Sequence, residues 1–326
     1  MHPAISVILL TTLIGAGQGL FLALFTVQSH ALVGVLAVAV PRSFYALGSA
    51  LALALLAAGL VASFFHLGRP ERAWRSATQW RTSWLSREVI VLPAFMAVVA
   101  LYGLAHGLET SPALLHLGRG VAVDISFVLG VLGTLLAFAL FVCTAMIYAC
   151  VRFLAEWHSP LTVVNYVLLG AASGFTLAGA LAGQAAPGLV GFLTGWAVLI
   201  TLLAAVGRGA SLWRNARLKP TSTLQSAIGV KHPVIAQKSQ GFMGGSFNTR
   251  EFFHGVTPGR LRAVKHTFVL LAFVFPVALL WLGREDVSAP WLVAAFLTQY
   301  VGLLAERWFF FAQANHPQNL YYQAVS

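Results

Sequence analysis

The sequence predicts an all-α integral membrane protein: a single transmembrane domain, residues 1–326, built as a bundle of eight transmembrane helices with one long cytoplasmic loop. Charged residues make up 9% of the chain and hydrophobic residues 59%, which is unlike a soluble domain. Apolar runs of about twenty residues, enough to cross a hydrocarbon core, recur along the chain. These runs are continuously apolar rather than alternating, which indicates helices and not barrel strands.

The predicted spans, in order, are residues 4–27, 44–65, 89–105, 125–150, 161–181, 188–206, 264–282 and 289–311. The first follows Met1-His2-Pro3 without a basic region, so we expect it to be retained rather than cleaved as a secretory peptide. The second and third spans flank a polar, arginine-rich connection. Glycines that permit close helix packing occur in the first and fifth spans, at Gly15, Gly17, Gly19, Gly170, Gly174 and Gly179.

The fourth span carries both cysteines, Cys143 and Cys150, at a spacing that places them on roughly one helix face. The chain has no Cys-x-x-Cys motif, so we do not expect an iron–sulfur cluster or a zinc–thiolate site within it. We interpret the two cysteines as small buried apolar residues.

The sixth and seventh spans enclose residues 207–263, the one long segment outside the predicted helices. Connections of this length are usually either functional or disordered, and this one has too many aromatic residues for a solvated linker. We interpret it as a partner-docking loop, with the alternative that it folds over the chain's own helices. The candidate docking residues in it are Phe242, Phe247, Arg250 and Phe252.

The distribution of positive charge predicts the orientation. Eight spans place both termini on the same side as the second, fourth and sixth connections, and of the 20 Lys and Arg residues only Arg42, Arg119 and Arg284 lie on the other side. The positive-inside rule then predicts a multi-pass membrane protein with both termini and the arginine-rich loops in the cytoplasm. The net charge of +11 is thereby explained without nucleic acid.

The second connection carries the chemistry that the sequence suggests most strongly. His66 ends the second span and Glu88 begins the third, at the same membrane edge, so the returning loop can bring them into one pocket. Neutral imidazole donates a hydrogen bond and passes on a proton near neutral pH, a partly buried carboxyl relays protons, and Arg72 would stabilise a developing negative oxygen. This set suits a quinone head group, and the quinone-binding candidates are His66, Arg72 and Glu88.

Simpler interpretations of these residues stay open. His66 would cap the second helix, and Glu88 would favour the positive N-terminus of the third by about 0.3–1 kcal/mol. The other arginines of the connection are candidates for partner docking or, alternatively, topology signals that contact lipid phosphates. They are Arg69, Arg75, Arg81 and Arg87.

Two other function classes have weaker support. A transmembrane b-type haem needs axial histidines within spans, and here all histidines lie at helix ends or in loops, so we expect no haem. A haem near one surface, between His66 and His266, is an alternative. A solute transporter would show buried charge pairs and broken helices, whereas we expect almost no charge at mid-depth, and Pro93 and Pro276 are the main interruptions.

The sequence His66-Leu67-Gly68-x-Pro70-x-Arg72-Ala73, followed by Leu85-Ser86-x-Glu88, closely resembles the signature loop of the dimethyl sulfoxide reductase anchor subunit family. The resemblance covers the length, the predicted span number and the motif position. It implies an eight-helix anchor that binds an iron–sulfur subunit and a molybdopterin catalytic subunit and exchanges electrons with a quinone. The family's quinone-linked His and Glu fall on His66 and Glu88.

The charge distribution places the signature loop in the cytoplasm, unlike the best-known family member. The chain therefore looks most like the membrane anchor of cytoplasmic-facing sulfite dehydrogenases. This resemblance implies a haem-free, quinone-binding (ubiquinone or menaquinone) anchor of a three-subunit molybdenum oxidoreductase that passes electrons from sulfite to the quinone pool. A quinol-oxidising anchor of a sulfoxide or polysulfide reductase is the alternative.

Overall fold

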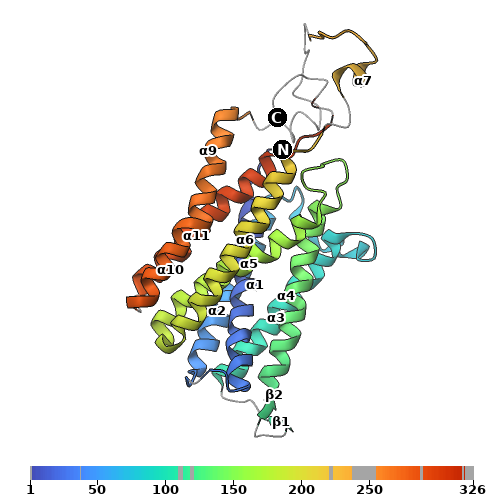
Figure 1. Ribbon diagram of the computed structural model, residues 1–326. Helices are drawn as coiled ribbons and strands as arrows, with labels where there is room; N and C mark the ends of the chain where they lie inside the picture. Colours follow the sequence, from blue (N-terminus) through green and yellow to red (C-terminus); the bar gives the residue numbers. More distant parts are fainter. Residues whose placement is uncertain are drawn as a thin grey trace.

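The protein is a bundle of long helices with one short β-hairpin (Figure 1). The computed structural model describes residues 2–36, 38–108, 113–117, 121–219, 223–236, 255–286, 289–317 and 319. The long helices of the first two-thirds of the chain are α1 (Ile5–Leu32), α2 (Arg42–Phe64), α3 (Trp84–Gly107), α4 (Ile125–Ala149), α5 (Pro160–Ala185) and α6 (Val190–Asn215). The others are α7 (Leu224–Ile228), α9 (Pro258–Val269), the π-helical turn η3 (Leu270–Val274), α10 (Phe275–Asp286) and α11 (Ala289–Ala312).

The all-α membrane architecture is confirmed. Seven helical segments of the described chain are long and apolar enough to cross a membrane, with α9, η3 and α10 acting as one of them. The eighth predicted span is also helical, as α11, and packs on α5, α9 and α10. The count of eight spans therefore stays a prediction, although each predicted segment is a helix.

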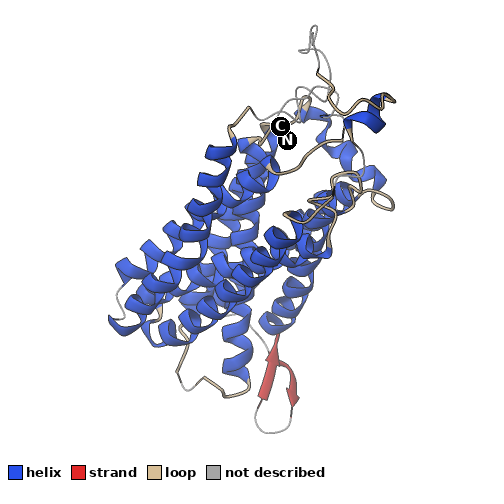
Figure 2. Cartoon of the chain, turned by 45° about the horizontal axis from the view of Figure 1, so that its top comes forward, coloured by secondary structure: helices blue, strands red, loops and turns tan. Residues whose placement is uncertain are grey.

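The helices run up and down, so alternate connections share an end of the bundle. The start of α1 and the helix α7 lie at one end, and the antiparallel hairpin of β1 (Ala113–Leu117) and β2 (Val121–Asp124) lies at the other (Figures 1 and 2). The hairpin leads directly into α4, where the Asp124 carboxylate caps the helix by accepting from the Phe127 amide at 2.9 Å. The end that carries α7 is the end predicted to be cytoplasmic.

Helices α1 and α5 form the centre of the bundle. Helix α1 packs against α2, α4, α5 and α11, and α5 packs against α6 and α11 as well. The two central helices cross where Gly19 and Gly174 meet, and a Cβ atom on Gly174 would collide with the backbone of Gly19 and Leu20. Only glycine permits this close approach, as the glycine pattern predicted.

The predicted long connection is shorter at both ends than residues 207–263. Helix α6 continues to Asn215, and α9 already begins at Pro258. The helix does not stop at Arg208 because this arginine is buried and ion-paired inside the bundle rather than released to water. The predicted docking residues Phe242, Phe247, Arg250 and Phe252 lie outside the described residues.

Candidate functional site

The end of α2, the connection that follows it and the start of α3 enclose a cavity of about 480 Å³, called the front cavity below. His66, Arg72 and Glu88, the three residues predicted to act together, all line it. Its walls are otherwise mostly apolar, from Leu10 on α1 and from Leu60, Phe64, Leu92 and Pro93 on α2 and α3. A cavity of this size with apolar walls and a few convergent polar groups is typical of a small-molecule site.

Glu88 is the buried polar group of the front cavity. It lies one turn into α3 and is only 6% exposed. Its Oε1 accepts a 2.5 Å hydrogen bond from the Thr144 hydroxyl of α4, which is equally buried. A buried carboxyl needs such a partner, and its position against a cavity makes it available to a ligand as well.

His66 lies two residues beyond the last residue of α2 and contributes to the mouth of the front cavity. The residue as a whole is exposed, yet its ring is partly enclosed by the cavity wall, and this burial lowers the pKa of the imidazole below its usual value of 6.5. His66 is therefore neutral at pH 7, and a neutral imidazole has one N–H to donate to a ligand.

The connection itself is a long 3₁₀-helix, η1 (Pro70–Gln79), that lies over the front cavity with none of its residues fully buried. Arg72 belongs to it, and its side chain is 50% exposed. Its only ion pair among the described residues is a loose one to the exposed Glu71, at 3.9 Å. The Arg72 guanidinium is consequently free to turn towards a ligand in the cavity, because exposed pairs of this kind are weak.

Hydrogen bonds from α3 hold this connection in place. Ser83 caps α3 by accepting from the Ser86 amide, and the Ser86 hydroxyl donates to the Ser76 carbonyl. Arg87 donates from Nε to the Trp80 carbonyl at 2.9 Å and from Nη2 to the Arg81 carbonyl at 2.8 Å. Arg87, which we predicted to dock a partner, thus stabilises the loop of its own chain.

The outer surface of the connection combines exposed arginine and tryptophan. Three of the arginines predicted to dock a partner are exposed: Arg69, Arg75 and Arg81. Trp74 and Trp80 are 67% and 53% exposed, with the guanidinium groups of Arg75 and Arg81 at 5.5 and 5.3 Å from their rings. Arginine and tryptophan are the residue types that dominate binding at protein interfaces.

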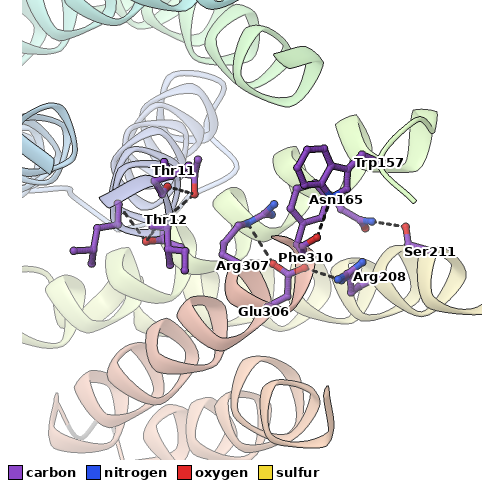
Figure 3. Close-up of polar contacts among 12 residues, drawn as sticks. Thr11, Thr12, Trp157, Asn165, Arg208, Ser211, Glu306, Arg307 and Phe310 are labelled. Atoms are coloured by element: carbon purple, nitrogen blue, oxygen red, sulfur yellow. Dashed lines mark hydrogen bonds and ion pairs between the residues drawn. The ribbon is translucent and has the colours of Figure 1, made fainter. Parts of the chain in front are cut away.

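A buried ionic cluster that sequence reasoning missed lies between α6 and α11. Glu306 of α11 lies between two arginines, with its Oε1 2.7 Å from Arg208 Nε of α6 and its Oε2 3.2 Å from Arg307 Nε (Figure 3). All three residues are at most 5% exposed. The prediction that Arg208 lies in a connection was wrong, because it belongs to α6.

A signal for this cluster was present. Glu306-Arg307 interrupts the apolar run of the last predicted span, and ionisable residues within spans are rare unless they pair or serve a function. The partner on α6 could not be found because it is about a hundred positions away in the chain.

The cysteines differ from each other. Cys143 is buried, as expected, whereas Cys150 at the end of α4 is exposed, and that part of the interpretation was wrong. Within the described ranges, no three His, Cys, Asp or Glu side chains are grouped so as to hold a metal ion.

Known proteins resemble this chain over nearly its whole length. The model of the DMSO reductase anchor subunit (DmsC) family matches residues 1–322. A sulfite dehydrogenase subunit from Allochromatium vinosum is 57% identical over 326 residues, which cover 100% of both chains.

Proposed function

Because the chain belongs to the DMSO reductase anchor subunit (DmsC) family, we propose that it is the haem-free, quinone-binding anchor of a three-subunit molybdopterin and iron–sulfur oxidoreductase. In this proposal the complex oxidises sulfite and passes the electrons to the quinone pool. The substrate is suggested by the relative of Allochromatium vinosum, which is named a sulfite dehydrogenase subunit and is 57% identical over the whole length.

One observation carries the quinone proposal: a single cavity of about 480 Å³ is lined by His66, Arg72 and Glu88 and otherwise mostly by apolar side chains. A quinone presents two carbonyl oxygens on a flat ring and an apolar tail. The lining of the front cavity suits both parts, because it includes hydrogen-bond donors and a carboxyl as well as apolar side chains such as Leu60, Phe64 and Pro93.

The side chains have distinct roles in this proposal. A bound quinone supplies a group that takes up two electrons and two protons. Neutral His66 donates a hydrogen bond to one carbonyl oxygen, and Arg72 stabilises negative charge that develops there. Glu88, held by Thr144, provides a proton from the buried side.

The partner subunits would dock on the end of the bundle that carries η1 and α7. Arg69, Arg75 and Arg81 steer an acidic partner electrostatically, and the exposed Trp74 and Trp80 provide apolar contact. The residues Phe242, Phe247, Arg250 and Phe252 are proposed to extend this surface. The charge distribution supports a cytoplasmic position for it and an inner-membrane location for the chain.

The alternative is a quinol-oxidising anchor that feeds a sulfoxide or polysulfide reductase. The name of the matching family favours it. The same cavity serves either direction, because His66 and Glu88 accept protons from a quinol as readily as they deliver them to a quinone.

The test is the purified complex with His66→Ala. We expect sulfite oxidation with decylubiquinone to fall at least about tenfold, since a donor to the reacting oxygen is lost, while oxidation with ferricyanide persists. The matched control is His266→Ala, an exposed histidine on α9 that does not line the front cavity. Equal loss of both activities would contradict the quinone role of His66, and reduction of dimethyl sulfoxide by decylubiquinol without sulfite oxidation would favour the alternative.

A further inference from the structure

We propose that the proton delivered by Glu88 is replaced through the interior of the bundle, along two small cavities that connect Glu88 by way of Tyr166 and Arg307 to Glu156 at the surface. This inference rests on the proposed function, because it concerns how the quinone site obtains its protons.

Glu88 faces a second space behind the front cavity. This inner cavity leaves about 20 Å³ for the centres of water molecules and is lined by polar groups from five helices. They include Thr11, Gln18, Glu88, Thr144, Tyr166 and Arg307. When a ligand fills the front cavity, the inner cavity is the polar side from which Glu88 can be approached.

A third space continues the series. The rear cavity leaves about 10 Å³ for water centres, and its polar lining consists of Glu156, Thr162, Asn165, Tyr166, Arg208, Ser211, Glu306 and Arg307. Tyr166 and Arg307 line both the inner and the rear cavity. Adjacent cavities therefore share lining residues: Glu88 joins the front cavity to the inner one, and Tyr166 and Arg307 join the inner cavity to the rear one.

Both cavities can hold water, because each has several polar side chains in its lining. Each has about the volume that one water molecule needs, and water occupies buried sites that offer several polar partners. In the described structure, Asn165 Oδ1 and Arg208 Nη2 at the rear cavity are buried and have no hydrogen-bond partner within the protein. Buried polar atoms of this kind are usually satisfied by ordered water.

The ionic cluster of Glu306, Arg208 and Arg307 positions the groups along the route but does not itself transfer protons. Glu306 holds Arg208 and Arg307 in place (Figure 3). The Arg307 guanidinium lies 3.9 Å from the centre of the Tyr166 ring. Arginine does not release its proton in proteins. The Tyr166 hydroxyl can instead donate a proton to water in one cavity while it accepts another from water in the other.

Glu156 is the entrance. It lies in the connection between α4 and α5, half-buried, and it lines the rear cavity. Arg214 of α6 holds this connection by donating to the carbonyls of Ala155 and His158, both at 3.1 Å. Burial raises the pKa of Glu156, so its carboxyl binds protons closer to neutral pH than an exposed glutamate does.

The polar groups at the opposite end of the bundle form a separate set. Tyr102 donates to Gln28 at 3.0 Å, and Gln28 donates to Ser126 at 2.7 Å. Between Gln28 and Gln18 on α1 lie Phe21 and Leu24, each 0% exposed. The described polar residues thus connect the quinone site to the end that carries Glu156, and protons are taken from that side.

The chemistry balances over one turnover. For each of the two electrons that arrive from sulfite, an O–H bond forms at one of the two quinone oxygens and the O–H bond of Glu88 breaks, so the sequence runs twice and delivers two protons per turnover. The Glu88 carboxylate then takes a proton from water in the inner cavity, and this water is reprotonated through the Tyr166 hydroxyl from the rear cavity. Tyr166 ends unchanged, and Glu156 takes the replacement proton from the solvent.

The experiment uses the purified complex with Glu156→Gln and with Tyr166→Phe, and Tyr45→Phe as the control. Tyr45 is equally a buried tyrosine, but it stacks on His106 at 4.3 Å and lines neither cavity. For both route variants we expect kcat with decylubiquinone to fall about tenfold, as for loss of one proton-transfer group. We also expect an unchanged KM, unchanged ferricyanide activity and an increased solvent deuterium isotope effect on kcat.

Each other outcome decides against the route. An unchanged kcat in both variants, or a loss shared by Tyr45→Phe, would overturn it while leaving the quinone site intact. A rise in KM or an equal loss of ferricyanide activity would show a structural role. If the unmodified complex does not reduce decylubiquinone at all, the proposed function fails, and this result is distinguishable from failure of the route.

Discussion

The Thr144 hydroxyl of α4 donates a 2.5 Å hydrogen bond to Glu88 Oε1 of α3, and both residues are 6% exposed. This contact joins two helices at the point where the front and inner cavities meet. It fixes the orientation of the one carboxyl that serves both spaces.

We predict that Thr144→Val lowers both activity and stability. Glu88 would lose the hydroxyl that donates to it inside the bundle, and an unsatisfied buried group costs about 1–3 kcal/mol. Thermal unfolding of the purified chain and decylubiquinone kinetics of the complex measure the two effects. Thr134→Val is the control, because that hydroxyl only bonds its own helix at the Gly130 carbonyl; an equal effect at Thr134 would contradict a specific role for Thr144.

Gly174→Ala is predicted to prevent normal packing of α1 on α5. The added methyl group would meet the backbone of Gly19 and Leu20, which cannot move aside as a side chain can. We expect a loss of at least about 3 kcal/mol, above the usual cost of overpacking, seen as a lower yield of folded chain and a lower Tm. Gly195→Ala, at an exposed position of α6, is the control. Its added methyl group would meet no atom within 4 Å, so the substitution should be neutral or slightly stabilising. A Tm for Gly174→Ala like that of the wild type would contradict this account of the crossing.

Glu306→Gln is predicted to destabilise the protein strongly. Two buried guanidinium groups would lose their shared carboxylate, and breaking a buried pair costs about 3–5 kcal/mol. Unfolding in detergent provides the measurement. The exposed pair of Glu71 and Arg72, at 3.9 Å, is the reference, since Glu71→Gln should cost only about 0–1 kcal/mol. Similar losses of stability in the two variants would contradict the larger contribution expected of the buried cluster.

Quinone-coupled activity should decline on the acid side only below pH 6.5. The pKa of His66 is lowered by burial, so its neutral, donating form persists down to a more acidic pH than in a free histidine. The free energy of unfolding changes in the same direction. The stabilisation that neutral His66 contributes is present above pH 6.5 and is lost as the pH falls through the lowered pKa of the imidazole. A pH profile of decylubiquinone reduction against ferricyanide reduction tests this, and an acid limb above pH 6.5 that disappears in His66→Gln would contradict it.

Charge reversal at Arg75 and Arg81 is predicted to weaken assembly. These exposed arginines lie on the proposed docking surface, so replacement by Glu should slow association and reduce its dependence on salt. Co-purification of the iron–sulfur subunit at rising salt measures the effect. Arg284→Glu, in the last turn of α10, is the control. Equal loss of the iron–sulfur subunit in that variant would contradict the assignment of the docking surface.

The local features of the chain could be predicted from its sequence because they depend on nearby residues. Apolar runs define helices wherever backbone groups have no water to bind, and the polar break between α2 and α3 places His66 and Glu88 at one membrane edge. The glycines of α1 and α5 indicated close packing for the same local reason. Helix ends were less predictable: α6 passes through Arg208 because a distant carboxylate neutralises it.

The sequence by itself determined the membrane architecture, the orientation signal and the grouping of His66, Arg72 and Glu88, because hydrophobicity and short connections act over neighbouring positions. Only the tertiary structure decided that Thr144 holds Glu88, that Glu306 joins Arg208 to Arg307, and that Tyr166 separates two small cavities. These contacts join residues far apart in the chain, and their free energies depend on which helix faces pack together once water is excluded.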